Sequence, residues 1–198
     1  MRINTLLMTI ALVLALIVPS HGAQGKNPGT QVTPAPGGAS IVPGVSMGPI
    51  ELGMTSAQMY SMGGPPSGSR TYDQLRQDFS QQGTPVDQYN LFINGFDTGE
   101  DFCTPGAPMS FGQVFYRGDR VMHIIISSWC VEGQMVNLRT AEGIGIGSTT
   151  QDVLRTYGKP DHQYYDASVG DVYDYLRRGI TIILANEHVE LIEIYQPE

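Results

Sequence analysis

The residues best suited to chemistry lie in one short acidic segment. His162 follows Asp161 and is followed by Asp166 and Asp171. Imidazole and carboxylate groups serve as metal ligands and as the acids and bases of hydrolases. Both roles require the side chains to converge on one point, which proximity in sequence does not ensure. A small secreted hydrolase or metal-binding protein is therefore an alternative. The favoured interpretation is a non-enzymatic protein with no catalytic residue, no metal and no cofactor.

Three shorter motifs resemble known sites but lack the setting that those sites need. Residues 44–48 match the G-x-S-x-G pattern of a serine nucleophile, yet Pro49 follows where a helix should begin. Residues 143–147 alternate glycine with isoleucine but lack the sixth-position glycine of a dinucleotide-binding loop. Residues 117–119 read Arg-Gly-Asp, a tripeptide that also suits a hairpin turn. We interpret all three motifs as structural.

An acidic stretch offers oxygen ligands. Asp97, Glu100 and Asp101 follow one another closely around Gly99. Carboxylates are the ligands that Ca²⁺ prefers, although the ion takes six or more oxygens. The spacing matches no calcium loop that we can name, so the sequence alone leaves calcium binding by residues 97–101 open.

The two cysteines, Cys103 and Cys130, are predicted to form a disulfide. In an oxidising compartment such a pair is most simply a bridge. Closing a loop of this length stabilises a fold by roughly 3–4 kcal/mol in the chain-entropy account. The pair lacks C-x-x-C spacing and therefore predicts no tetrahedral metal site.

Aromatic residues are the preferred candidates for binding. Tyr and Trp dominate the energetics of protein interfaces, although they also stabilise sheets through cross-strand pairs. Tyr173 and Tyr175 share one face of a predicted strand because side chains alternate. If that face is open, we expect it to form the contact surface, together with Trp129 and Tyr195.

The elements that must position these residues are short. Thr55 and Thr149 are each predicted to cap a helix, and Gly64 and Gly158 to end those helices. A further helix is expected over 71–81, where apolar residues recur at helical spacing. Strands are expected at 50–52, 89–94, 113–117, 120–128, 172–176, 180–185 and 188–195.

The chain contains a faint internal repeat. Residues 50–66 match residues 144–160, and residues 114–126 match residues 182–194. The apolar spacing in the second pair of segments mixes three with two, which predicts a β-bulge at the same place in two hairpins. We therefore expect an α+β fold in which two diverged helix-plus-antiparallel-hairpin repeats, 49–128 and 144–198, form one domain.

The second repeat also resembles a known family. The segments that carry the resemblance are Gly147-Ser148-Thr149, Gly158-Lys159-Pro160, Tyr173-Asp174-Tyr175, Gly179-Ile180 and residues 189–194. They are similar to the SmpA/OmlA family of small outer-membrane-assembly lipoproteins, and two copies in tandem are similar to the β-lactamase inhibitory protein fold. The chain lacks the lipidated cysteine of those lipoproteins. The resemblance implies helices packed on an antiparallel sheet and a non-catalytic protein-binding module.

The N-terminal region has the form of an export signal and a linker. Residues 1–23 combine Arg2, an apolar stretch over 6–18 and small residues at the expected cleavage site. That stretch is shorter than the about 20 residues needed to cross a membrane, so no integral membrane segment is expected after cleavage. Residues 24–48, rich in Pro and Gly, are expected to form a flexible spacer before a single domain at 49–198.

The net negative charge of the chain limits the classes of partner that it is expected to bind. The formal net charge is −8, and loss of Arg2 with the signal makes it −9. An acidic surface repels phosphate backbones, so nucleic acid is excluded as an expected partner. We expect a periplasmic or secreted module of the bacterial cell envelope or medium that binds another protein. A structural or assembly-supporting envelope component remains an alternative.

Overall fold

The structure is a computed structural model that describes residues 40–81, 86–107, 109–131, 135 and 137–197. The predicted signal peptide at 1–23 and residues 24–39 of the predicted spacer lie outside the described residues.

An eight-stranded antiparallel sheet forms the centre of the fold. Its strand order is β4-β5-β6-β7-β12-β11-β10-β9. β12, the last strand along the chain, therefore lies between β7 and β11, with β4 and β9 at the edges. The strands are β4 (Gly68–Thr71), β5 (Thr98–Phe102), β6 (Gly112–Arg117), β7 (Arg120–Ser127), β9 (His162–Asp166), β10 (Gly170–Tyr175), β11 (Ile180–Ala185) and β12 (His188–Tyr195).

A second, four-stranded sheet has the order β3-β2-β1-β8, in which β1 and β8 are parallel. Its strands are β1 (Ser40–Val42), β2 (Ser46–Met47), β3 (Ile50–Glu51) and β8 (Arg139–Thr140). Ile41 and Met47 are fully buried. Residues 40–48 thus belong to the folded domain, which corrects the expected spacer boundary at 48: two buried apolar side chains among Pro and Gly suffice to anchor short strands.

Two of the helices, α2 (Ser56–Gly63) and α5 (Thr150–Tyr157), begin directly after the capping residues that the sequence predicts. The other helices that the structure describes are α3 (Tyr72–Gln81) and α4 (Asn90–Asn94), with 3-10 turns η1 (Val86–Gln88) and η3 (Leu176–Arg178). Thr55 and Thr149 form capping boxes with Gln58 and Asp152, and both caps are confirmed. The strand predicted at 89–94 is wrong, because this segment forms α4.

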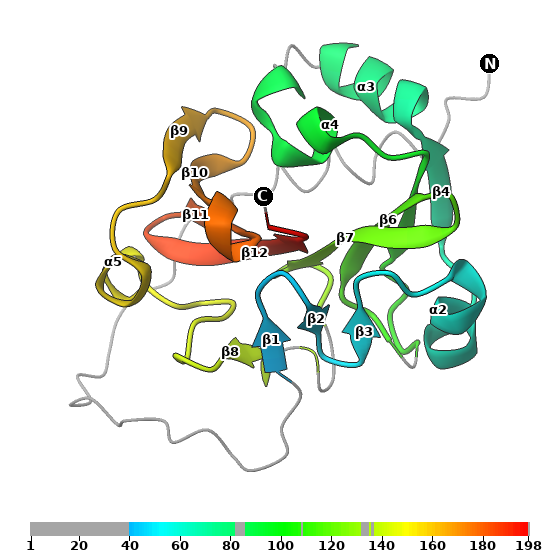
Figure 1. Ribbon diagram of the computed structural model, residues 1–198, viewed down its shortest axis with the longest axis horizontal. Coiled ribbons are helices and arrows are strands. Elements are labelled where there is room, and N and C mark those ends of the chain that lie inside the picture. The colour runs from blue at the N-terminus through cyan, green and yellow to red at the C-terminus, as the bar shows by residue number, and fades with distance from the viewer. Residues whose placement is uncertain (1–39, 82–85, 108, 132–134, 136, 198) are drawn as a thin grey trace.

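The elements form layers, with α3 and α4 on one side of the large sheet and the small sheet on the other (Figure 1). Two apolar clusters result. The larger cluster joins the large sheet to the small sheet, α2 and α5. The smaller cluster packs α3, η1 and α4 on the opposite face through Leu75, Leu91, Phe92, Phe96 and Phe115. The mixed helix and antiparallel-sheet class is confirmed.

Two hairpins share the same irregularity. The β6–β7 register shifts between Phe115 and Tyr116, and the β11–β12 register shifts between Ile183 and Leu184. The predicted bulges are therefore present in both hairpins. Both connecting turns have positive φ at their two central positions, 118–119 and 186–187. The Arg-Gly-Asp tripeptide thus lies in a tight turn, as interpreted from the sequence.

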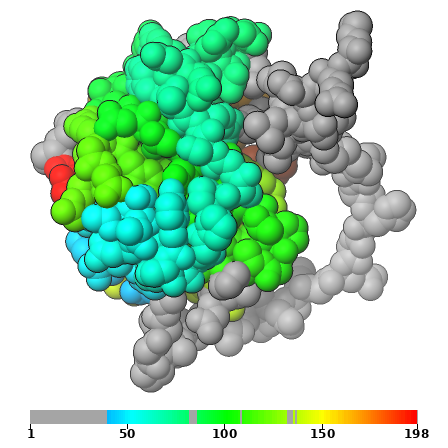
Figure 2. Space-filling model, turned by 90° about the vertical axis from the view of Figure 1, so that its right-hand side faces the viewer, coloured from blue at the N-terminus to red at the C-terminus, as the bar shows by residue number. Residues whose placement is uncertain are grey.

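The β4 edge of the large sheet lies between helices. Figure 2 looks onto this side of the molecule, where α2 and α3 appear in cyan and teal. Among the described residues, no helix is both long enough and apolar enough to span a membrane.

Candidate functional site

The predicted disulfide is present. Cys103, which follows β5, is bonded to Cys130, which follows β7, with their Cα atoms 5.3 Å apart. The bridge joins two segments 27 residues apart in sequence. It therefore fixes the loop after β7 to the body of the sheet.

Three of the four predicted binding aromatics are buried. Tyr173 and Tyr175 do share one face, but that face belongs to the larger core, and their side chains are 6% and 3% exposed. Tyr195 is 1% exposed. The expected contact surface on these tyrosines is therefore corrected, because α5 and the small sheet cover Tyr173 and Tyr175, while Tyr195 lies on the opposite face, beneath α4.

Trp129 is the exception, since 54% of it is exposed. Its backbone lies in a fixed turn. The amides of Cys130 and Val131 both donate to the Ser127 carbonyl, at 3.1 and 3.0 Å. The Ser110 hydroxyl donates to the Cys130 carbonyl at 2.8 Å. A large indole is thus presented to solvent from a backbone held by hydrogen bonds and a disulfide.

A buried polar cluster occupies the other face of the large sheet, beneath α4. The Asn90 side-chain amide donates to the Thr181 hydroxyl at 3.2 Å and to the Tyr195 hydroxyl at 3.0 Å. The Thr181 hydroxyl in turn donates to Asp174 Oδ1 at 2.7 Å. These side chains come from α4, β10, β11 and β12. The cluster links the segment between β4 and β5 to strands about 90 residues further along.

A buried hydrogen-bonded pair of titratable side chains lies beside this cluster. His123 Nδ1 is 2.7 Å from Glu193 Oε1, and the two side chains are 1% and 8% exposed. They project from β7 and β12, the two strands that meet at the middle of the sheet. The His123 ring also packs on the Tyr195 ring, with centroids 5.6 Å apart. Sequence analysis missed this pair, because 70 residues separate its members.

Burial raises the pKa of Asp174 to about 6, and the nearby Glu193 carboxylate acts in the same direction. The Thr181 hydroxyl opposes this shift by donating to the charged form. Since the folded-state pKa lies above the ordinary value of about 3.9, the folded protein binds the extra proton between these two values. Asp174 therefore contributes stability at low pH that is lost as the pH rises through about 6.

Asp174→Asn should remove this pH dependence. Asn keeps the Oδ1 acceptor for Thr181 but carries no charge at any pH. The unfolding free energy of the variant minus that of wild type should therefore be about 2–3 kcal/mol larger at about pH 7 than at about pH 4. Urea unfolding at a series of pH values measures this difference. A difference that stays constant with pH would contradict the assignment.

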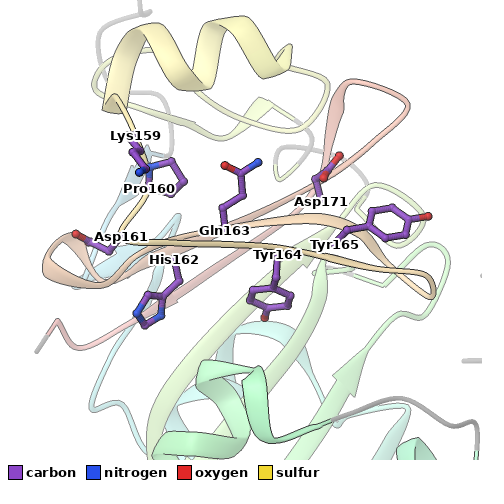
Figure 3. Close-up of a pocket in the computed structure, with 8 residues that line it drawn as sticks. All are labelled: Lys159, Pro160, Asp161, His162, Gln163, Tyr164, Tyr165 and Asp171. Carbon is purple, nitrogen blue, oxygen red and sulfur yellow. The ribbon is translucent and has the colours of Figure 1, made fainter.

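The His162 segment forms a groove along the edge strand β9. The groove has a volume of about 760 Å³. Figure 3 shows that His162 and Tyr164 point to the side of the strand opposite from Gln163 and Asp171. Asp161 instead pairs with Arg177 at 3.1 Å. His162 and the acids therefore do not converge, and no group of three or more metal-ligating side chains occurs among the described residues.

The acidic stretch at 97–101 does not converge either. The Gly118 amide donates to Asp97 Oδ2 at 2.7 Å. Glu100 accepts a hydrogen bond from Tyr60, while Asp101 pairs with Arg70 at 3.0 Å. Because Glu100 and Asp101 are adjacent on β5, they project to opposite faces. Their partners are structural, so this arrangement does not supply a calcium cage.

The two glycine motifs also have structural settings. Ser46 lies on the two-residue strand β2 and is followed by a turn, so the strand-to-helix elbow is missing there. Residues 143–147 lead into the Thr149 cap. At Gly145, a Cβ atom would lie 2.3 Å from the Leu138 carbonyl oxygen, so close backbone approach explains that glycine.

Comparison with known proteins found no matching family model, curated protein or solved structure.

Proposed function

We propose that the chain is an exported, non-catalytic module of the bacterial cell envelope or medium that binds another protein. The observation that carries this proposal is the exposed Trp129 on a backbone fixed by the Cys103–Cys130 bridge. Trp is among the residues most enriched at the energetic centres of interfaces. A backbone that is already ordered loses little further entropy on binding.

Charge and compartment support the same proposal. The net charge of −8 favours association with a basic surface. The disulfide favours an oxidising compartment, namely the periplasm or the medium. Together they suggest a basic protein partner outside the cytoplasm.

We also propose that the domain arose by duplication. Support comes from matching hydrogen bonds in the two halves of the chain. In the first repeat, Gly53 N donates to Val121 O, and Val121 N donates to Met54 O. In the second repeat, the equivalent residues form the same two bonds: Gly147 N donates to Val189 O, and Val189 N donates to Ser148 O. The paired capping boxes and bulges add to this support. The proposed kinship with SmpA/OmlA-like and β-lactamase inhibitory protein-like binding modules rests on this repeat.

Trp129→Ala should weaken partner binding by roughly thirtyfold or more, since a hot-spot residue contributes about 2 kcal/mol or more. The oxidised protein is first used to capture proteins from the envelope and medium of the source organism. The dissociation constant of each captured protein is then measured by calorimetry for wild type and variant.

Tyr165→Ala is the matched control, because Tyr165 is a still more exposed aromatic, at 70%, on the distant edge strand β9. Its binding should equal that of wild type. Equal loss from both variants, or unchanged binding by the Trp129 variant, would overturn the proposed contact site.

A further inference from the structure

We infer that the His123–Glu193 pair forms part of a binding site for a small carboxylate. A cavity of about 220 Å³ lies where the end of α4 meets the β6–β7 hairpin. It is lined by Asn94, Arg117, Met122, His123, Tyr195, Gln196 and Pro197. This site is separate from Trp129 and does not depend on the protein-binding role proposed above.

His123 gives the cavity a directed polar group. The ring is 1% exposed and reaches the cavity wall. Its Nδ1 is engaged by the Glu193 carboxylate, which fixes the ring and favours a proton on that nitrogen. Within the described part of the chain, Nε2 has no hydrogen-bond partner. Nε2 is therefore the nitrogen that a ligand in the cavity can use.

Arg117 gives the cavity a positive charge. It lies two residues from Phe115, the residue paired with His123 across the hairpin, so Arg117 and His123 share a face of the sheet. Its guanidinium donates to the Gly95 carbonyl at 2.8 Å, just after α4. A guanidinium has five N–H donors, so this contact orients the group and leaves others for a ligand.

These groups select an anion over a metal cation. A guanidinium repels metal ions, whereas it binds carboxylates through charge-assisted hydrogen bonds. A carboxylate in the cavity accepts hydrogen bonds from the Arg117 guanidinium, and it is held at His123 Nε2 through a proton that binds together with it, while Nδ1 keeps its hydrogen bond to Glu193.

The size of the cavity limits the ligand. Sites for drug-sized molecules and cofactors occupy roughly 300–1,000 Å³. A cavity of about 220 Å³ instead suits a small carboxylic acid or the C-terminal carboxylate of a peptide. The bulge beside Met122 places an irregular stretch of strand directly before His123, as is common at sites that aim a side chain.

The test uses acetate as a probe and the intact, oxidised protein. Acetate should shift the His123 Nε2 nitrogen resonance saturably and more than the Nδ1 resonance. Arg117→Gln should weaken acetate binding by about tenfold, because it removes a charge-assisted contact. If neither acetate nor the peptide described below produces a saturable shift, the proposed site is overturned.

Arg120→Gln is the matched control. Arg120 lies across the same turn, opposite Arg117, and its guanidinium also donates to a glycine carbonyl, that of Gly53, at 3.1 Å. It does not line the cavity. Its removal should leave acetate affinity unchanged, and equal weakening in both variants would show a general charge effect and overturn the site.

Two further titrations distinguish the sources of the carboxylate. One uses a short peptide with a free C-terminus, and the other uses the same peptide with an amidated C-terminus. Tighter binding of the free peptide than of acetate, with no binding of the amide, assigns a peptide end. Equal affinities of acetate and the free peptide assign a small free acid.

Discussion

Replacing His123 with Leu is expected to lower the free energy of unfolding by about 3–5 kcal/mol, because the change leaves the buried Glu193 carboxylate without its partner. Both side chains are buried at the junction of β7 and β12, so water cannot replace the lost contact without opening the sheet. Denaturant unfolding at neutral pH, with the disulfide intact, measures the loss.

The double variant His123→Leu with Glu193→Met provides the control. Replacing both members of a buried pair with apolar side chains is often neutral or stabilising, so the double variant should be more stable than the single His123 variant. The single variants His123→Leu and Glu193→Met are measured alongside it. If the loss of unfolding free energy in the double variant equals the sum of the losses in the two single variants, the contact contributes no coupling and the interpretation fails.

Removing the disulfide is expected to cost about 3–4 kcal/mol. Cys103 and Cys130 close a loop of 27 residues in sequence separation, and the bridge restricts the unfolded chain. The paired Cys103→Ala and Cys130→Ala variant should show this loss in chemical unfolding. Wild type treated with reductant should lose a similar amount, and a loss below about 1 kcal/mol in both samples would contradict the prediction.

The same variant tests whether the Cys103–Cys130 disulfide contributes to partner binding through Trp129. Without the Cys130 bond, the backbone around Trp129 is held only by its turn hydrogen bonds. If preorganisation matters, partner affinity should fall even though Trp129 is retained. Unchanged affinity would mean that the indole, and not its fixed backbone, determines binding.

Local signals in the sequence were sufficient for the caps and the hairpins. Thr55 and Thr149 with their N3 partners determine where α2 and α5 start, because the cap contacts span only three residues. The hairpins β6–β7 and β11–β12 follow from alternating apolar residues and short turns. The bulges were predictable because each changes the apolar spacing within its own strand.

Other elements depend on contacts that no local pattern encodes. Residues 89–94 have strand-like composition, but Leu91 and Phe92 pack into the smaller cluster as α4. Tertiary packing overrides propensity in such a short segment. The edge strands β4 and β9 are polar and were missed, because an edge strand need not carry an apolar run.

In the candidate sites, too, local sequence signals predict some features, whereas others depend on long-range contacts. Alternation correctly placed Tyr173 and Tyr175 on one face, but which face is covered depends on where α5 and the small sheet pack. His123, Asp174 and Glu193 converge only after β7, β10 and β12 have joined one sheet. A single sequence carries no signal for such long-range convergence.

The central position of β12 sets an order for folding during synthesis. β7 and β11 both pair with β12, so each presents an unpaired edge until residues 188–195 have left the ribosome. The polar cluster on Asn90 and the His123 contact must also wait for Tyr195 and Glu193. The large sheet therefore completes only after translation of its last strand, and nascent chains stalled before that point should be captured by chaperones that recognise open strand edges.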